Sequence, residues 1–220
     1  MTLPMEPEVV ICPVCQTVNH PDRLRSTHAF GSPSLDLRPP PDEGYCLEYM
    51  IESCSHCNYV ARTLDSTPLK GTAVAMASPS WSALMARQDI SELCSEFKRG
   101  ELIRRQSQDL KGAVWMAFRA VWVSDDVTPP ASASLRREAA ELLKNAMASG
   151  TPYVDAPGGN ESLIADLYRR ATDWSDASSW AEEGLEIAED PVIGAVLAFE
   201  LKLINAQDDR HYLIEDALPE

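Results

Sequence analysis

The alternation of hydrophobic and polar positions changes its period near residue 70. Upstream, residues 9–11 form a short apolar run and residues 45–52 alternate with a period of two, which is typical of β-strands. Downstream, apolar residues recur three and four positions apart, which is typical of amphipathic helices. We therefore expect two domains, over residues 1–70 and 71–220, in a mainly α fold with a small β part at the N-terminus.

Prolines and glycines divide the helical part. Gly100 is expected to end a first helix, and Pro129 and Pro130 interrupt the pattern after the second. Asp190 before Pro191 is a favourable helix start, because aspartate caps free backbone N–H groups and proline suits the first turn. The expected helical segments are residues 80–97, 108–124, 135–146, 161–172, 176–188, 191–206 and 209–218.

The stretch between the two β segments is rich in proline. Pro33, Pro39, Pro40 and Pro41 lack backbone N–H donors and favour extended or turn geometry. We therefore expect residues 30–41 to form an ordered or semi-ordered loop and not a helix.

Two C-x-x-C pairs carry the clearest chemistry in the chain. Cys12 and Cys15 form the first pair, and Cys54 and Cys57 form the second after 38 intervening residues. A two-residue gap lets both thiolates of a pair turn toward one point, so two pairs supply the four soft ligands of a closed tetrahedral zinc site. We expect one structural Zn²⁺ in an N-terminal zinc ribbon. Rubredoxin-like iron and a redox dithiol are the alternatives.

The remaining cysteines and histidines are weaker candidates. Cys46 in the alternating segment and Cys94 in a helical one are expected to be small buried hydrophobic residues. His56 lies inside the second pair and is interpreted as a turn residue. His20 and His28 would be substitute ligands only if one thiolate did not bind.

The net charge of −15 is concentrated in the last third of the chain, where residues 151–220 carry 16 acidic and 4 basic side chains. Such a surface repels phosphate backbones, so direct nucleic-acid binding is disfavoured. It is either a solvated face that aids solubility or a docking surface for a basic protein segment. We expect Trp115 and Trp122 to lie inside the helical domain. The acidic surface is expected around Asp166, Glu182, Glu183, Glu186 and Glu189.

One stretch in the last third resembles a tetratricopeptide repeat, in which small residues let two antiparallel helices approach closely while aromatic residues fill the gap. The match covers about 30 residues and departs from the repeat pattern at Thr172, Ala181 and Pro191. The resemblance implies a tetratricopeptide-like helical bundle or solenoid. Its residues are Ile164, Ala165, Tyr168, Trp174, Ala177, Ala181, Gly184 and Leu185.

The whole arrangement resembles a family of uncharacterised bacterial proteins with a four-cysteine zinc ribbon before tetratricopeptide-like helices. The resemblance rests on both C-x-x-C pairs, Arg23 and Arg25 between them, and Tyr59 and Ala61 after the second pair. It implies the architecture and the ligands Cys12, Cys15, Cys54 and Cys57 but no activity.

The function expected from these features is a non-enzymatic protein-interaction module that acts as an adaptor or scaffold. The alternative is a nucleic-acid-associated regulator that uses the ribbon, for which Arg23, Arg25 and Arg38 are the basic residues near it. Catalysis is disfavoured because four thiolates leave no open metal position, and the sequence contains no nucleophile elbow, H-E-x-x-H helix or phosphate-binding glycine loop. Without a signal peptide or a long apolar run, we expect a cytoplasmic protein.

Overall fold

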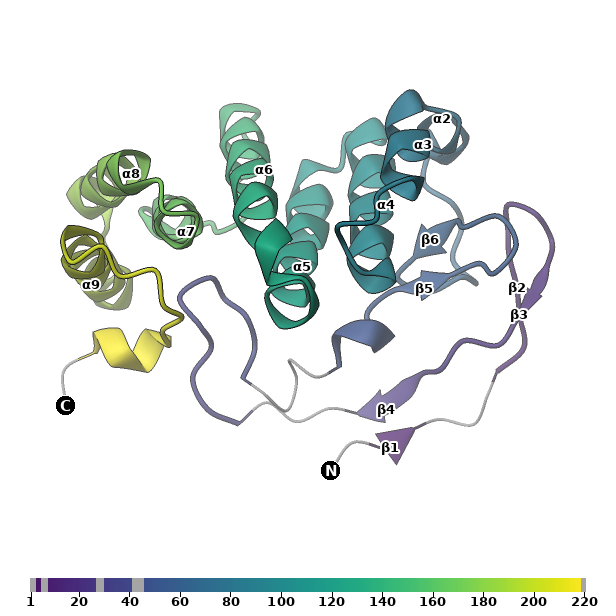
Figure 1. The fold of residues 1–220 in the computed structure, drawn as a ribbon, viewed down its shortest axis with the longest axis horizontal. Helices are drawn as coiled ribbons and strands as arrows, with labels where there is room; N and C mark the ends of the chain where they lie inside the picture. Colours follow the sequence, from purple (N-terminus) through teal and green to yellow (C-terminus); the bar gives the residue numbers. More distant parts are fainter. Residues whose placement is uncertain (1–2, 5–7, 27–29, 41–45, 219–220) are drawn as a thin grey trace. The chain divides into compact units, whose positions relative to one another are not determined.

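The computed structural model describes residues 3–4, 8–26, 30–40 and 46–218 (Figure 1). The chain divides into two compact units. The N-terminal unit comprises residues 1–30 and 41–128, and the C-terminal unit comprises residues 31–40 and 129–220. These two units have other bounds than the two domains expected over residues 1–70 and 71–220. That division into domains remains a prediction. Among the described residues, no helix is both long enough and apolar enough to cross a membrane.

The strands of the N-terminal unit are short antiparallel pairs. They are β1 (Leu3–Pro4) with β4 (Leu24–Ser26), β2 (Val10–Ile11) with β3 (Val18–Asn19), and β5 (Glu52–Ser53) with β6 (Val60–Ala61). The apolar run at residues 9–11 therefore does contain a strand. The strand expected from the alternation over residues 45–52 is wrong for most of its described length. The 3₁₀ helix η1 (Leu47–Tyr49) forms there and precedes the two residues of β5. Tyr45 lies outside the described residues.

The helices of the N-terminal unit are α2 (Thr72–Met76), α3 (Pro79–Met85), α4 (Glu92–Gln106) and α5 (Leu110–Val127). The single helix expected over residues 80–97 is instead α3 and the first part of α4. Ser91 separates them as the cap of α4, since its Oγ accepts a hydrogen bond from Cys94 N at 3.3 Å.

Gly100 does not end a helix, contrary to the expectation. It is buried within α4, beside α5, and a Cβ at this position would lie 3.0 Å from Met116 Sδ. Its missing side chain therefore leaves room for Met116 where α4 and α5 pack side by side (Figure 1).

Helix α5 supplies much of the N-terminal core and confirms the helix expected over residues 108–124. Phe118, Val121 and Trp122 are nearly inaccessible to solvent. Trp115, also expected inside, is half-buried instead, and the guanidinium of Arg119 lies over its ring.

The C-terminal unit is built from α6 (Pro129–Ala148), α7 (Gly159–Arg170), α8 (Trp174–Ile187) and α9 (Pro191–Asn205). Asp190 caps α9 as expected, because its Oδ1 accepts a hydrogen bond from Val192 N at 2.7 Å. The α-helix expected over residues 209–218 is absent from the described chain. Only a 3₁₀ turn, η2 (Ile214–Ala217), forms there.

Small residues allow α7, α8 and α9 to pack closely. Ala177 and Ala181 have no exposed surface, and a Cβ on Gly184 would lie 2.7 Å from Glu161 Cβ and 3.0 Å from Leu197 Cδ2. Leu185, which the repeat pattern included, is instead 40% exposed. Helix α8 thus approaches α7 and α9 closely in the structure.

The proline-rich loop is ordered over residues 31–40 and packs within the C-terminal unit, as expected for an ordered loop. Ser34 forms an isolated antiparallel bridge with Leu213, and Leu35 N donates to Tyr212 O at 3.1 Å. The Leu35 side chain is buried in an apolar cluster with Val196 and Leu203. The loop therefore contributes to the core of this unit. Pro41 lies outside the described residues.

A buried ionic cluster joins α7 to α9. The guanidinium of Arg169 contacts Asp166 Oδ1 at 2.5 Å and Glu200 Oε2 at 2.7 Å, and these side chains are almost fully buried. Asp166 was expected on the acidic surface, so that expectation was wrong. Its ion pair with Arg169 explains how a carboxylate can be buried here.

Candidate metal centre

The two C-x-x-C pairs have the same backbone geometry. In the first, Cys12 N donates to Thr17 O at 2.9 Å and Gln16 N donates to Cys12 O at 2.9 Å. Gln16 takes a left-handed backbone conformation with φ of 63°. This turn reverses the chain between β2 and β3.

The second pair repeats this arrangement between β5 and β6. Cys54 N donates to Tyr59 O at 2.8 Å, and Asn58 N donates to Cys54 O at 3.0 Å. Asn58 is also left-handed, with φ of 59°. We call residues 12–17 and 54–59 the first and second knuckle. The two knuckles thus share the same backbone hydrogen bonds and the same left-handed position.

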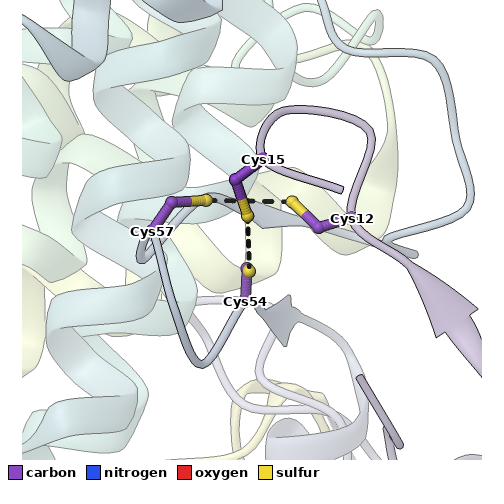
Figure 2. Close-up of side chains that lie close together, drawn as sticks. All are labelled: Cys12, Cys15, Cys54 and Cys57. Atoms are coloured by element: carbon purple, nitrogen blue, oxygen red, sulfur yellow. Dashed lines mark hydrogen bonds between the residues drawn. The ribbon is translucent and has the colours of Figure 1, made fainter. Parts of the chain in front are cut away.

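The four sulfur atoms converge on one point (Figure 2). All lie within 4.8 Å of one another, with Cys15 Sγ 3.5 Å from Cys54 Sγ and Cys12 Sγ 3.8 Å from Cys57 Sγ. A tetrahedral metal with metal–sulfur bonds of about 2.3 Å would separate its sulfur ligands by about 3.8 Å. These distances exceed the roughly 2.05 Å of a disulfide, so the cluster suits a metal better than a covalent pair.

Backbone N–H groups near the sulfur atoms favour the thiolate form in a repeated pattern. Those of Val14 and Cys15 act to lower the pKa of Cys12, and those of His56 and Cys57 act to lower the pKa of Cys54. The N–H group two positions later acts in the same way on the pKa of the second cysteine of each pair, Thr17 on Cys15 and Tyr59 on Cys57. Such donors stabilise thiolates, which are the form that binds a metal.

The metal-free thiols differ in acidity. The Thr17 side chain, 3.4 Å from Cys15 Sγ, lowers the pKa of Cys15 to about 6, aided by the Thr17 backbone N–H. Burial raises the pKa of both Cys12 and Cys57. Burial also opposes ionisation of Cys54, but the backbone N–H groups of Cys57 and His56 leave its pKa lowered. Metal binding must therefore displace protons from at least some of these thiols.

The other candidate ligands lie outside the cluster. Cys46 and Cys94 are buried, as expected for small hydrophobic residues, and Cys94 Sγ donates to Ala120 O. His20 and His56 are exposed, and neither belongs to the four-residue group. His28 lies outside the described residues.

Arg23, a basic residue expected near the ribbon, is engaged with carboxylates. Its guanidinium contacts Glu52 at 2.6 Å, Glu8 at 2.6 Å and Asp65 at 3.2 Å. Glu52 Oε2 also accepts a hydrogen bond from Leu64 N at 2.7 Å. Arg23 thus holds neighbouring segments of the N-terminal unit together, and its charge is already compensated.

Sequence reasoning did not single out Thr17 and Asn19, whose side chains contact Cys15 and Cys54 respectively. A threonine and an asparagine after a C-x-x-C pair carry no recognisable spacing signal. Thr17 contacts Cys15 within the same hairpin, whereas the role of Asn19 depends on the approach of the second C-x-x-C pair, which the sequence pattern does not show.

Comparisons with known proteins return no match: no family model, no curated protein and no solved structure is similar to the chain. The geometry of the cysteine cluster and the helical body therefore carry the functional argument.

Proposed function

We propose that the chain is a non-enzymatic zinc-binding protein that serves as an adaptor or scaffold for another protein. The observation that carries the metal-binding part is the convergence of Cys12, Cys15, Cys54 and Cys57 on one point. With four thiolates bound, a tetrahedral metal has no position left for water or substrate, so its role would be structural.

Zinc fits this donor set because structural zinc sites take four thiolates in a closed tetrahedron. Iron accepts the same ligands and is the alternative, distinguishable by its colour and redox activity. In the reducing cytoplasm, the compartment we propose, the four thiols would stay reduced and able to bind metal.

Helix α8 supports the interaction part of the proposal. Residues 174–190 contain no lysine or arginine, and their exposed acidic side chains are Asp176, Glu182, Glu183, Glu186, Glu189 and Asp190. Leu185 and Ile187 on the same helix are 40% and 45% exposed. We call the acidic side chains of α8 the α8 face, and a basic partner segment would complement it.

The helical packing is compatible with a tetratricopeptide-like stack and with the bacterial family that the sequence resembles. Ala177, Ala181 and Gly184 let α8 approach its neighbours closely, as the small residues of such repeats do. In this proposal, the stacked helices form the scaffold that presents the α8 face.

Affinity capture tests the interaction, with the wild-type chain and a Glu182→Lys/Glu183→Lys/Glu186→Lys variant as baits. We expect wild-type bait to retain a defined protein at low salt, with a slower association rate at 0.15 M salt, where charges are screened beyond about 8 Å. The variant should lose that protein. A Glu138→Lys variant, changed at an exposed residue of α6, should keep it.

Equal capture by the wild type and the triple variant would contradict the proposed docking face. Recovery of nucleic acid instead of protein would favour the regulator alternative. Among the described residues, Arg23 does not support that alternative, because its guanidinium is already paired with three carboxylates.

A further inference from the structure

Asn19 connects the two knuckles of the metal centre. It lies at the end of β3 and is 7% exposed. Its Nδ2 donates one hydrogen bond to Thr17 O at 2.9 Å and another to Cys54 Sγ at 3.6 Å. Its Oδ1 accepts from Ser55 N at 3.0 Å and from Ser55 Oγ at 3.1 Å. Both donors and both acceptor positions of the amide are therefore used.

The second hairpin shows that a knuckle does not need an asparagine at this position in order to fold. Asn19 follows Cys12 by seven residues, and the residue seven positions after Cys54 is Ala61. The backbone hydrogen bonds of the two knuckles are otherwise the same. The presence of an asparagine at position 19 is thus explained by its hydrogen bonds to Cys54 and Ser55 of the second knuckle.

We infer that Asn19 is a positioning residue of the metal centre: its amide group holds the Cys54 thiolate in place, and its carbonyl oxygen fixes the second knuckle against the first hairpin. The inference rests on the proposed metal binding. A divalent metal with four thiolates carries a net charge of −2, and an N–H donor to sulfur disperses part of that charge. Partners that orient metal ligands in this way strengthen binding.

The test compares the wild-type full-length chain with Asn19→Ala, with Zn²⁺ and Co²⁺ as probes. Chelator competition should show that Asn19→Ala binds Zn²⁺ about 10- to 100-fold more weakly. The thiolate-to-cobalt charge-transfer absorption should also shift, because Cys54 loses its side-chain donor. This spectral readout reports on the sulfur ligands themselves and would not respond to a loss of stability elsewhere.

Two further variants separate the contacts of Asn19. Asn19→Asp has the same shape and keeps an oxygen to accept from Ser55, but it places a carboxylate beside Cys54 Sγ. It should weaken Zn²⁺ binding at least as much as Asn19→Ala, and it provides the comparison if the alanine variant does not fold. Ser55→Ala removes one hydrogen bond to Oδ1 and leaves the donor to sulfur, so its cobalt spectrum should match that of the wild type.

Wild-type Zn²⁺ affinity and an unchanged cobalt spectrum in both Asn19 variants would overturn this inference alone. A wild-type chain that binds neither metal would overturn the proposed metal centre together with it.

Discussion

At the scale of single residues, small side chains determine where helices approach closely. Gly100 leaves space for Met116 at the α4–α5 contact, and Gly184 leaves space for Glu161 and Leu197 at the contacts of α8. Ala177 lies on the same helix with no exposed surface. Added volume at these positions has nowhere to go without moving a helix.

Ala177→Leu should lower the free energy of unfolding by about 1–3 kcal/mol, because it overfills this contact. Thermal or chemical denaturation measures the change. Ser179→Leu adds a leucine at an exposed position of α8 and should change stability by less than about 0.5 kcal/mol. Equal stability of the Ala177 variant and the wild type would show that α8 is not tightly packed there.

The buried ionic cluster predicts a pH dependence of stability. Burial raises the pKa of Glu200 well above its ordinary value, and the nearby charge of Asp166 adds to this, against the opposing effect of Arg169. The folded chain therefore holds a proton that the unfolded chain has lost, and stability must fall as pH rises toward the folded pKa. Burial raises the pKa of Asp36 too, so this carboxyl also makes stability fall as pH rises.

Other groups near the cluster contribute at lower pH. The pKa of His211 is lowered, first by burial, so its contribution to stability is lost as pH falls below about 6.5. The pKa of Asp166 is also lowered on balance: Arg169 favours its charged form against the effect of burial. The stability that the ionised Asp166 carboxylate contributes to the fold is therefore lost in acid.

Glu200→Gln should therefore flatten the decline of unfolding free energy as the pH rises above 4.5 toward the folded pKa of Glu200, because glutamine mimics the protonated carboxyl. Urea denaturation at several pH values measures the slope. Glu183→Gln removes an exposed carboxyl of α8 and should leave the slope unchanged. A Glu200→Gln variant with the wild-type slope would show that Glu200 is ionised when folded.

At the scale of elements, local signals predicted some features and not others. The strand around residues 9–11, the helix α5 and the cap at Asp190 follow from short-range patterns, and the structure contains them. Gly100 looked like a helix end because glycine is a poor helix former, but its packing against Met116 outweighs that preference. The alternation before Cys54 predicted a longer strand, but η1 fills most of its described part.

The four clustered cysteines could be predicted from their spacing, because two C-x-x-C pairs are enough to define a tetrahedral ligand set. Their supporting partners could not, since Asn19 and Ser55 are 36 residues apart and meet only in the folded chain. The burial of Asp166 was missed for the same reason, because its ion pair with Arg169 becomes buried only when α9 packs against α7.

The knuckles themselves give a prediction at this scale. Cys54→Ser removes one of four ligands, so the purified variant should lose its metal, and residues 1–70 should become sensitive to protease because metal binding stabilises the ribbon. Limited proteolysis with mass spectrometry locates the cuts. Cys46→Ala should retain the metal, since Cys46 lies outside the cluster. Full metal content in Cys54→Ser would remove Cys54 from the ligand set.

At the scale of the whole molecule, the chain combines one closed ligand cluster with a strongly acidic last third. Both features are compatible with a protein whose fold is stabilised by a bound metal and which presents a surface to a partner. The interaction part of the proposal depends on the α8 face. The structural part depends on the metal.

Metal content therefore tests the central claim most directly. Native mass spectrometry and elemental analysis of the full-length chain, purified without added metal or chelator, should give one zinc per chain and a colourless protein. Protein with no bound metal, or a red protein that contains iron, would contradict the account.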